Sequence, residues 1–330
     1  KGGMMTMPGP KTHDIFYKDL KKNLSKKTLA SFPNYDKYNI FVQGHDFLIY
    51  YDFYNSKVRD ANIDLSVELQ EHKFQEYVYN YLKTAKESGT LELEDVRLFI
   101  GPGYVMHHLL DAYTHPLIIY YSGDHVRDPE TKIWNHGVVE NLLDIYMMET
   151  FEGKDAKSYR VYKDFKIDED LISNELIKTI DDSLEETYEI AGGGDIFKKA
   201  FKQLAFYMRL MKYDSWGLKT QFFDKVLGPF AKCSKAFSYH RDYDEVIPYL
   251  NLEHEEWINP TDANVVSRES FVDLYLKALE DGSYIVDELE KICQSGVINK
   301  DDIYSLIPNI SSVHGLECEK EVKILNKKKW

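Results

Sequence analysis

The sequence has few cysteines, a deficit of positive charge and no long uninterrupted hydrophobic run. Only three of its 330 residues are cysteines, and Cys233, Cys293 and Cys318 lie far apart, with no CxxC pair. This spacing excludes a disulfide framework and a thiolate metal site, and an odd number is typical of a reducing compartment. The 41 basic and 55 acidic residues give a net charge of -14. Nucleic acid is therefore not expected as a partner, because phosphate backbones are bound by basic surfaces.

Membrane insertion and secretion are not expected either. The least charged stretch, residues 98–123, contains three histidines, an aspartate and two prolines, which a lipid-facing helix would rarely carry. Residues 1–10 lack the apolar core of a secretory signal. We therefore expect a cytoplasmic protein without a transmembrane segment. Nothing in the sequence indicates its oligomeric state.

Helical periodicity dominates the chain, and no period-two strand series or hairpin signal accompanies it. We expect an all-α fold, a multi-helix bundle. Residues 7–152 would form a metal-binding helical core, and residues 153–330 would add helices that complete the same domain. The expected helices span residues 11–31, 35–55, 63–88, 91–121, 134–151, 169–190, 196–226, 270–281 and 284–295, with a loop over 152–166.

Polar residues recur every four positions in the most apolar of these helices. His107, Asp111 and His115 share one face of a helix whose other positions are almost all apolar. A second helix carries His136 and Glu140 at the same spacing. Such residues, once buried, must pair with one another or bind a metal. Two such helices in succession favour a metal, because imidazole and carboxylate are the ligands of zinc and similar ions.

The ordered set of polar motifs resembles the bacterial zinc-dependent phospholipase C family, in its cytosolic branch, over about residues 7–150. The motifs are an N-terminal His13, Gly44–Asp46 in an aromatic run, a mid-chain His72, His107–Asp111, His115 beside proline, and His136–Glu140. The resemblance implies an all-α bundle of the phospholipase C / P1 nuclease type, with metal ions clustered at the end of the helices.

Carried over residue by residue, the resemblance also implies a ligand set for zinc. One ion would be held by His115, His136 and Glu140, a second by His72 and His107 with Asp111 as a bridge, and a further position would include His13. Two zinc ions are expected. A third has less support, because in secreted members of the family the amino terminus released by signal cleavage is itself a ligand.

The remaining expectations concern residues around the metals. Asp46 would be the catalytic residue that holds or deprotonates the attacking water. His45 could be an extra ligand or mere filler around the ligands, His108 and Asp144 could lie around them, and His254 and Trp257 could line the mouth of the site. A surface loop pinned by the tryptophan is the alternative for the last two. Residues 229–260 otherwise allow no assignment.

The implied activity is that of a metal-dependent phosphoesterase, which hydrolyses a phosphodiester or phospholipid with a metal-bound water. Its substrate would be a small phosphoester or a phospholipid. An HD-type phosphohydrolase is the alternative enzyme, because His13–Asp14 and His45–Asp46 are HD dipeptides, but it explains His136 and Glu140 less well. A non-catalytic helical scaffold with a vestigial metal site is the third possibility.

Overall fold

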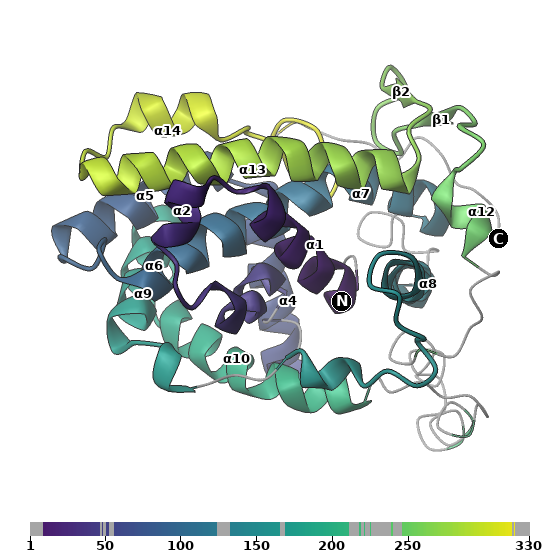
Figure 1. The fold of residues 1–330 in the computed structure, drawn as a ribbon, viewed down its shortest axis with the longest axis horizontal. Coiled ribbons are helices and arrows are strands. Elements are labelled where there is room, and N and C mark those ends of the chain that lie inside the picture. Colours follow the sequence, from purple (N-terminus) through teal and green to yellow (C-terminus); the bar gives the residue numbers. More distant parts are fainter. Residues whose placement is uncertain are drawn as a thin grey trace.

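Helices make up most of the structure, a computed structural model that describes residues 9–46, 48, 51–52, 56–123, 133–165, 169–210, 218, 221, 225, 239, 246–318 and 320 (Figure 1). The only sheet in these ranges is an antiparallel pair, β1 (Trp257–Ile258) and β2 (Val266–Ser267). The expectation of an all-α fold is confirmed at this level. No helix within the described ranges has the length and apolar character needed to cross a membrane.

The α-helices have the following bounds in chain order: α1 Pro10–Asn23, α2 Lys26–Ala30, α4 Ser56–Glu71, α5 Phe74–Glu87, α6 Glu94–Leu98, α7 Met106–Ser122, α8 Ile133–Thr150, α9 Asn174–Tyr188, α10 Gly193–Leu210, α12 Ile247–Leu250, α13 Phe271–Ser295 and α14 Lys300–Leu306. Shorter turns join them: η1 Tyr35–Lys37, η2 Asn39–Gln43, η4 Val161–Lys163 and η5 Glu169–Leu171 are 3-10 segments, and η3 Phe99–Val105 is a π-helical turn.

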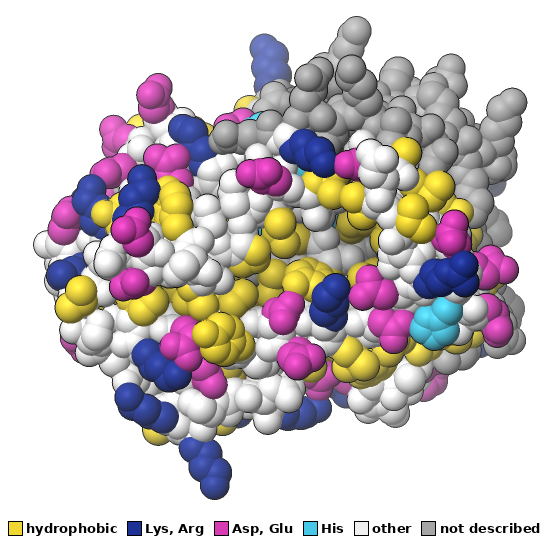
Figure 2. Space-filling view, turned by 90° about the horizontal axis from the view of Figure 1, so that it is seen from above, with side chains coloured by type: hydrophobic (Ala, Val, Ile, Leu, Met, Phe, Trp, Pro, Cys, Tyr) yellow, Lys and Arg dark blue, Asp and Glu magenta, His cyan; other side chains and the backbone are white. Residues whose placement is uncertain are grey.

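The buried helix α7 is the centre of the arrangement. It contacts α13, α8, α1 and η3, and α1 in turn contacts α8, η2 and α13 (Figure 1). Helices α5, α9 and α10 pack in sequence beside this group. The uppermost face, formed by α13 and α14 in Figure 1, has hydrophobic side chains gathered in a central hollow with acidic and basic side chains around it (Figure 2). Helix α13, from the second part of the chain, packs against α7 and α1 of the first part.

Several expected helices are interrupted by backbone turns. The helix expected over 63–88 is two helices, because Lys73 adopts a left-handed conformation with φ 52° between α4 and α5. Of the helix expected over 35–55, residues 35–46 instead form η1, η2 and a turn at Gly44, whose φ is 53°, while Leu48 is helical and the rest lies mostly outside the described residues. The helix expected over 11–31 breaks between α1 and α2. The one expected over 91–121 passes through η3, which contains Pro102.

In one place the structure has a single helix where two were expected. The two helices expected over 270–281 and 284–295 are the single helix α13, which runs through Gly282. A Cβ atom on Gly282 would lie 2.6 Å from Sδ of Met106, so this glycine allows α13 to approach α7 closely. Helix α8 and the loop after it match the expectation. The last part of the helix expected over 196–226 lies mostly outside the described residues.

The N-terminus of α1 is capped by Asp144, which comes from α8. One carboxylate oxygen accepts hydrogen bonds from the backbone N–H and the hydroxyl of Thr12, both at 2.7 Å. The other accepts from the backbone N–H of Lys11 at 3.2 Å and from the hydroxyl of Tyr239 at 2.6 Å. A Cβ atom on Gly9 would lie 2.2 Å from this carboxylate. Asp144 therefore fixes where α1 begins relative to α8.

We predict that Asp144→Ala lowers the free energy of unfolding by about 2–4 kcal/mol, because it removes a helix cap and leaves buried donors without an acceptor. Ser173→Ala is the matched control, since Ser173 caps α9 through a single hydrogen bond to the backbone N–H of Leu176. That variant should lose only about 1 kcal/mol. Chemical denaturation of both variants provides the comparison, and equal losses would contradict the role given to Asp144.

Candidate metal centre

Helix α7 places three polar side chains on one buried face. His107, Asp111 and His115 follow one another at intervals of four residues, and each is no more than 2% exposed. Most of its other buried residues are Leu, Ile, Met and Ala, so its burial is driven by apolar contacts with its neighbours. Every other group of the site is brought to this face by a different segment of the chain.

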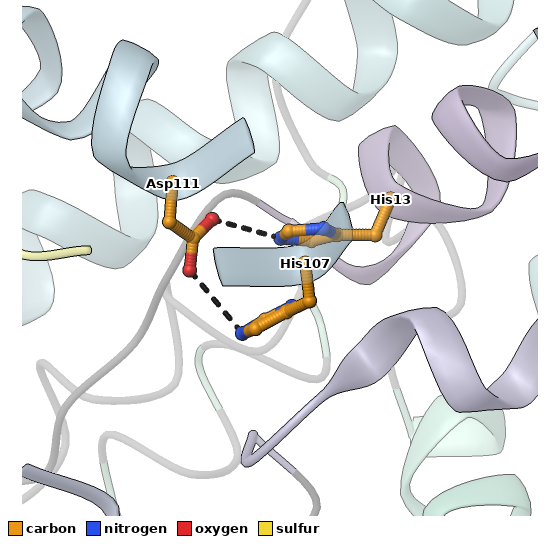
Figure 3. Close-up of side chains that lie close together, drawn as sticks. All are labelled: His13, His107 and Asp111. Carbon is orange, nitrogen blue, oxygen red and sulfur yellow. Dashed lines mark ion pairs between the residues drawn. The ribbon is translucent and has the colours of Figure 1, made fainter. Parts of the chain in front are cut away.

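His13 from α1 meets His107 and Asp111 in the first cluster (Figure 3). Nε2 of His13 lies 3.1 Å from one oxygen of Asp111, and Nε2 of His107 lies 3.2 Å from the other. The two imidazole rings are stacked with their centroids 4.4 Å apart. All three side chains are completely buried. The carboxylate therefore faces two ring nitrogens at once.

His45 and Asp46 approach His107 from the turn that follows η2. One oxygen of Asp46 lies 3.5 Å from Nδ1 of His45 and 3.6 Å from Nε2 of His107. Nδ1 of His107 lies 3.0 Å from the carbonyl of Val42, and since a carbonyl only accepts, this nitrogen carries the proton. Only Nε2 of His107 remains to bind a metal, so the two clusters share it. We call their five residues group A: His13, His45, Asp46, His107 and Asp111.

A second cluster, group B, consists of His115 from α7 and of His136 and Glu140 from α8. Nε2 of His136 lies 2.8 Å from Oε1 of Glu140, and the two imidazole rings are 5.4 Å apart. His115 donates through Nδ1 to the carbonyl of Ser312 at 2.5 Å. Nδ1 of His136 lies 3.1 Å from the hydroxyl of Ser122. Each histidine of group B thus uses Nδ1 for a protein neighbour, as metal-binding histidines commonly do.

Burial controls the protonation of these groups. Removal from water lowers the pKa of His13 and of His45 to about 4, and that of His115 to about 3, so the imidazoles are neutral at pH 7. Burial raises the pKa of Asp111 well above its usual range. Asp46 is also buried, but His107 and His45 hold the pKa of its carboxyl well below the usual range. Neutral imidazole is the form that binds metals.

The geometry of group A fits a metal better than a hydrogen-bonded core. Among the described residues, no hydrogen bond of normal geometry reaches either oxygen of Asp111, Nε2 of His107 or either ring nitrogen of His13, although all are buried. Leaving such atoms without partners costs several kcal/mol. The ligand atoms of each cluster lie within 4.8 Å of one another. Groups A and B could therefore each hold a metal ion, and their nitrogen and oxygen donors suit a divalent one.

His72 does not lie where it was expected, and His45 lies near that place. His72 belongs to neither group A nor group B; α4 ends just before it and the chain turns at Lys73. His72 is half-buried, and its carbonyl accepts a hydrogen bond from the hydroxyl of Tyr188 at 2.8 Å. The expected pairing of His72 and His107 on one ion is therefore not observed. His45 lies beside His107 instead.

The other expected residues are distributed around the site in different ways. His108 stacks on Phe74 at 3.5 Å and bonds to the carbonyl of Ile310, so it supports α7 and lies in neither group. Asp144 caps α1, which carries His13. His254 is exposed and bonds to a backbone carbonyl. The hairpin is pinned instead by Trp257, which is buried beside Tyr120, as the alternative expectation held.

The groups that orient the histidines were not predicted from the sequence. Val42 and Ser312 act through backbone carbonyls, which leave no pattern in a sequence. Ser122 acts through its hydroxyl, but nothing marks it among the other serines. Gly44 could have been found from the sequence, because it is a glycine directly before His45–Asp46. A Cβ atom there would lie 2.2 Å from the ring of His107, and its positive φ also favours glycine.

Comparisons with protein-family models, curated proteins and solved structures found no match to this chain.

We predict that Gly44→Ala weakens metal binding by group A about 10–100-fold, because the new methyl group displaces His107 from its carbonyl partner. Gly89→Ala is the control: Gly89 also has a positive φ, of 72°, but nothing lies within 4 Å of its Cβ position. Zinc titration of metal-free protein measures the effect. Equal affinities in the two variants would show that the approach to His107 does not matter.

Proposed function

We propose that the protein is a zinc-dependent phosphoesterase that uses group A and group B together. The observation that carries the proposal is the pair of buried histidine–carboxylate groups on successive turns of α7. Along a helix each step of four residues advances about 6 Å, so Asp111 lies between His107 and His115. The charge of Asp46 acts on His13 in group A and on His115 in group B, so the two groups share one electrostatic environment.

Divalent ions in such a pair of sites act as Lewis acids that neutralise phosphoryl oxygens and lower the pKa of water. The chain's own residues would supply the remaining functions. Asp111 would offset the positive charge within group A, and His115, His136 and Glu140 would anchor group B. Asp46 would orient the attacking water or take its proton, since its carboxyl is held ionised by His107 and His45.

The membership of the two groups supports the resemblance to zinc-dependent phospholipase C and the P1 nuclease type of bundle. Of the residues that the resemblance assigns to the site, six expected ligands and the expected catalytic Asp46 fall in the two groups, whereas His72 does not: His13, Asp46, His107, Asp111, His115, His136 and Glu140. The scarcity of cysteine supports a cytoplasmic protein. The proposed substrate is a phosphoester, either a small soluble phosphodiester or a phospholipid headgroup, which present the same phosphate to the site.

The HD-type alternative fits one of its two dipeptides, since His45–Asp46 lies in group A, but not the other. The carboxylate of Asp14 is occupied by Lys11 and Lys18 and by the amide of Asn39, so His13–Asp14 does not act as a metal-binding dipeptide. Lys11 is itself fully buried among Asp14, Glu152 and Asp164, which ties α1 to the loop after α8. This network explains Asp14 as a structural residue.

We predict that protein purified without added metal contains about two zinc ions per chain and hydrolyses at least one phosphoester. The measurement is elemental analysis, followed by a panel of a soluble phosphodiester, a phosphomonoester and phosphatidylcholine vesicles. Removal of the metal by a chelator should abolish turnover, and zinc should restore it. Full metal occupancy with no hydrolysis of any substrate would favour the non-catalytic scaffold.

We predict different outcomes for the two aspartates of group A. Asp46→Asn should retain most of the zinc but lose turnover by about 10²–10⁴, because the amide cannot accept a proton. Asp111→Asn should lose zinc and activity together, because its carboxylate faces two histidines of the group. The exposed Asp36, changed to Asn, is the control and should change neither. Loss of zinc from Asp46→Asn would make Asp46 a ligand and contradict its role as the base.

A further inference from the structure

Residues 310–316, which follow α14, form a loop that lies against α7 beside group B. We call this loop the strap. The carbonyl of Ile310 accepts a hydrogen bond from Nε2 of His108 at 2.6 Å, and the carbonyl of Ser312 accepts one from Nδ1 of His115 at 2.5 Å. The backbone N–H of Ser312 donates to the carbonyl of Gln70 at 3.1 Å. The strap thus contacts two histidines that precede it by about 200 residues.

The strap can approach α7 closely because Pro116 lacks a backbone N–H and Gly315 lacks a side chain. Pro116 has no N–H, so it cannot give Ala112 the usual helical hydrogen bond. Gly315 lies at this position, with φ 65°, and a Cβ atom on it would lie 2.4 Å from the carbonyl oxygen of Ala112 and 2.9 Å from Cγ of Pro116. Any larger residue must push the strap and α7 apart.

The strap is also held in one shape by its own hydrogen bonds. The N–H of Ser311 donates to the carbonyl of Leu316 at 2.8 Å, and the N–H of Gly315 donates to the carbonyl of Ser311 at 2.9 Å. The side chain of Asn259 donates to the carbonyl of His314 at 2.9 Å, which joins the strap to the segment between β1 and β2. A rigid loop presents the Ser312 carbonyl in a fixed direction.

We propose that the strap is a positioning element for group B. Because the Ser312 carbonyl can only accept, it holds the proton on Nδ1 of His115 and leaves Nε2 as the lone-pair nitrogen that faces His136 and Glu140. The strap thereby fixes the tautomer and the ring orientation of His115. The strap thereby influences the metal affinity of group B, and the metal affinity of group A does not depend on it. This inference rests on the proposed function only in that group B binds a metal.

The strap should affect group B and not group A, because the carbonyls that orient their histidines come from different segments of the chain. His107 in group A is oriented by Val42, at the end of η2, and His115 in group B is oriented by Ser312 in the strap. These segments are 270 positions apart in the sequence. A displacement of the strap should therefore weaken one group and spare the other, whereas general destabilisation would weaken both.

The test is zinc titration of metal-free protein by calorimetry. Gly315→Ala should lower the affinity of group B about 10–100-fold, the usual effect of losing a group that orients a ligand, and leave group A unchanged. Gly296→Ala is the matched control, since Gly296 has nearly the same φ, 64°, with nothing within 4 Å of its Cβ position. Ser312→Ala should also retain both affinities, because the contact is made by the backbone. Unchanged affinities in Gly315→Ala, or equal losses in both groups, would overturn the proposal.

If the Gly315→Ala variant fails to fold, the proposal can be tested in two other ways. Asn259→Ala removes only the hydrogen bond to His314 and its local contacts, and it should weaken group B alone, by a smaller factor. In metal-free wild-type protein, nitrogen NMR of the imidazoles should show His115 protonated at Nδ1, and the strap variants should show a mixture of tautomers. Protonation at Nε2 in the wild type would overturn the proposal. A wild type that binds no zinc but shows the expected tautomer would refute the proposed function and leave the strap's effect on His115 supported.

Discussion

The burial of imidazoles and carboxylates along α7 is the constraint on which the rest of the structure depends. His107, Asp111 and His115 lie in an apolar interior where an uncompensated carboxylate is unstable, and burial, together with the nearby charge of Asp46, raises the pKa of Asp111 well above its usual range. A bound cation would remove this penalty, because it favours the ionised carboxylate and the neutral imidazole together. Folding and metal binding would therefore be coupled in this chain.

The neighbouring segments are arranged to hold the metal-facing nitrogens in place. Val42 and Ser312 orient His107 and His115 through carbonyls, and Gly44 and Gly315 allow the backbone to come that close. Asp144 fixes the start of α1 and hence the place of His13. None of these residues belongs to group A or group B. They decide which ring nitrogen is available and where it points, as orienting partners do in many metal sites.

The sequence allowed the helical class and most of the residues of groups A and B to be predicted, because both depend largely on spacing within one helix. His107, Asp111 and His115 share a face of α7 by periodicity alone, and so do His136 and Glu140 on α8. That His72 lies in neither group could not be predicted, since α4 ends before it at the left-handed turn of Lys73. The strap could not be predicted either, because it acts through backbone atoms that every residue possesses.

The most direct test of the account is a crystal structure of the zinc-loaded protein with anomalous scattering measured at the zinc edge. The account predicts one peak among His13, His45, Asp46, His107 and Asp111, and another among His115, His136 and Glu140. It also predicts that the Val42 and Ser312 carbonyls remain bonded to Nδ1 of their histidines. An absence of zinc from both groups, or zinc bound only by residues elsewhere on the chain, would contradict it.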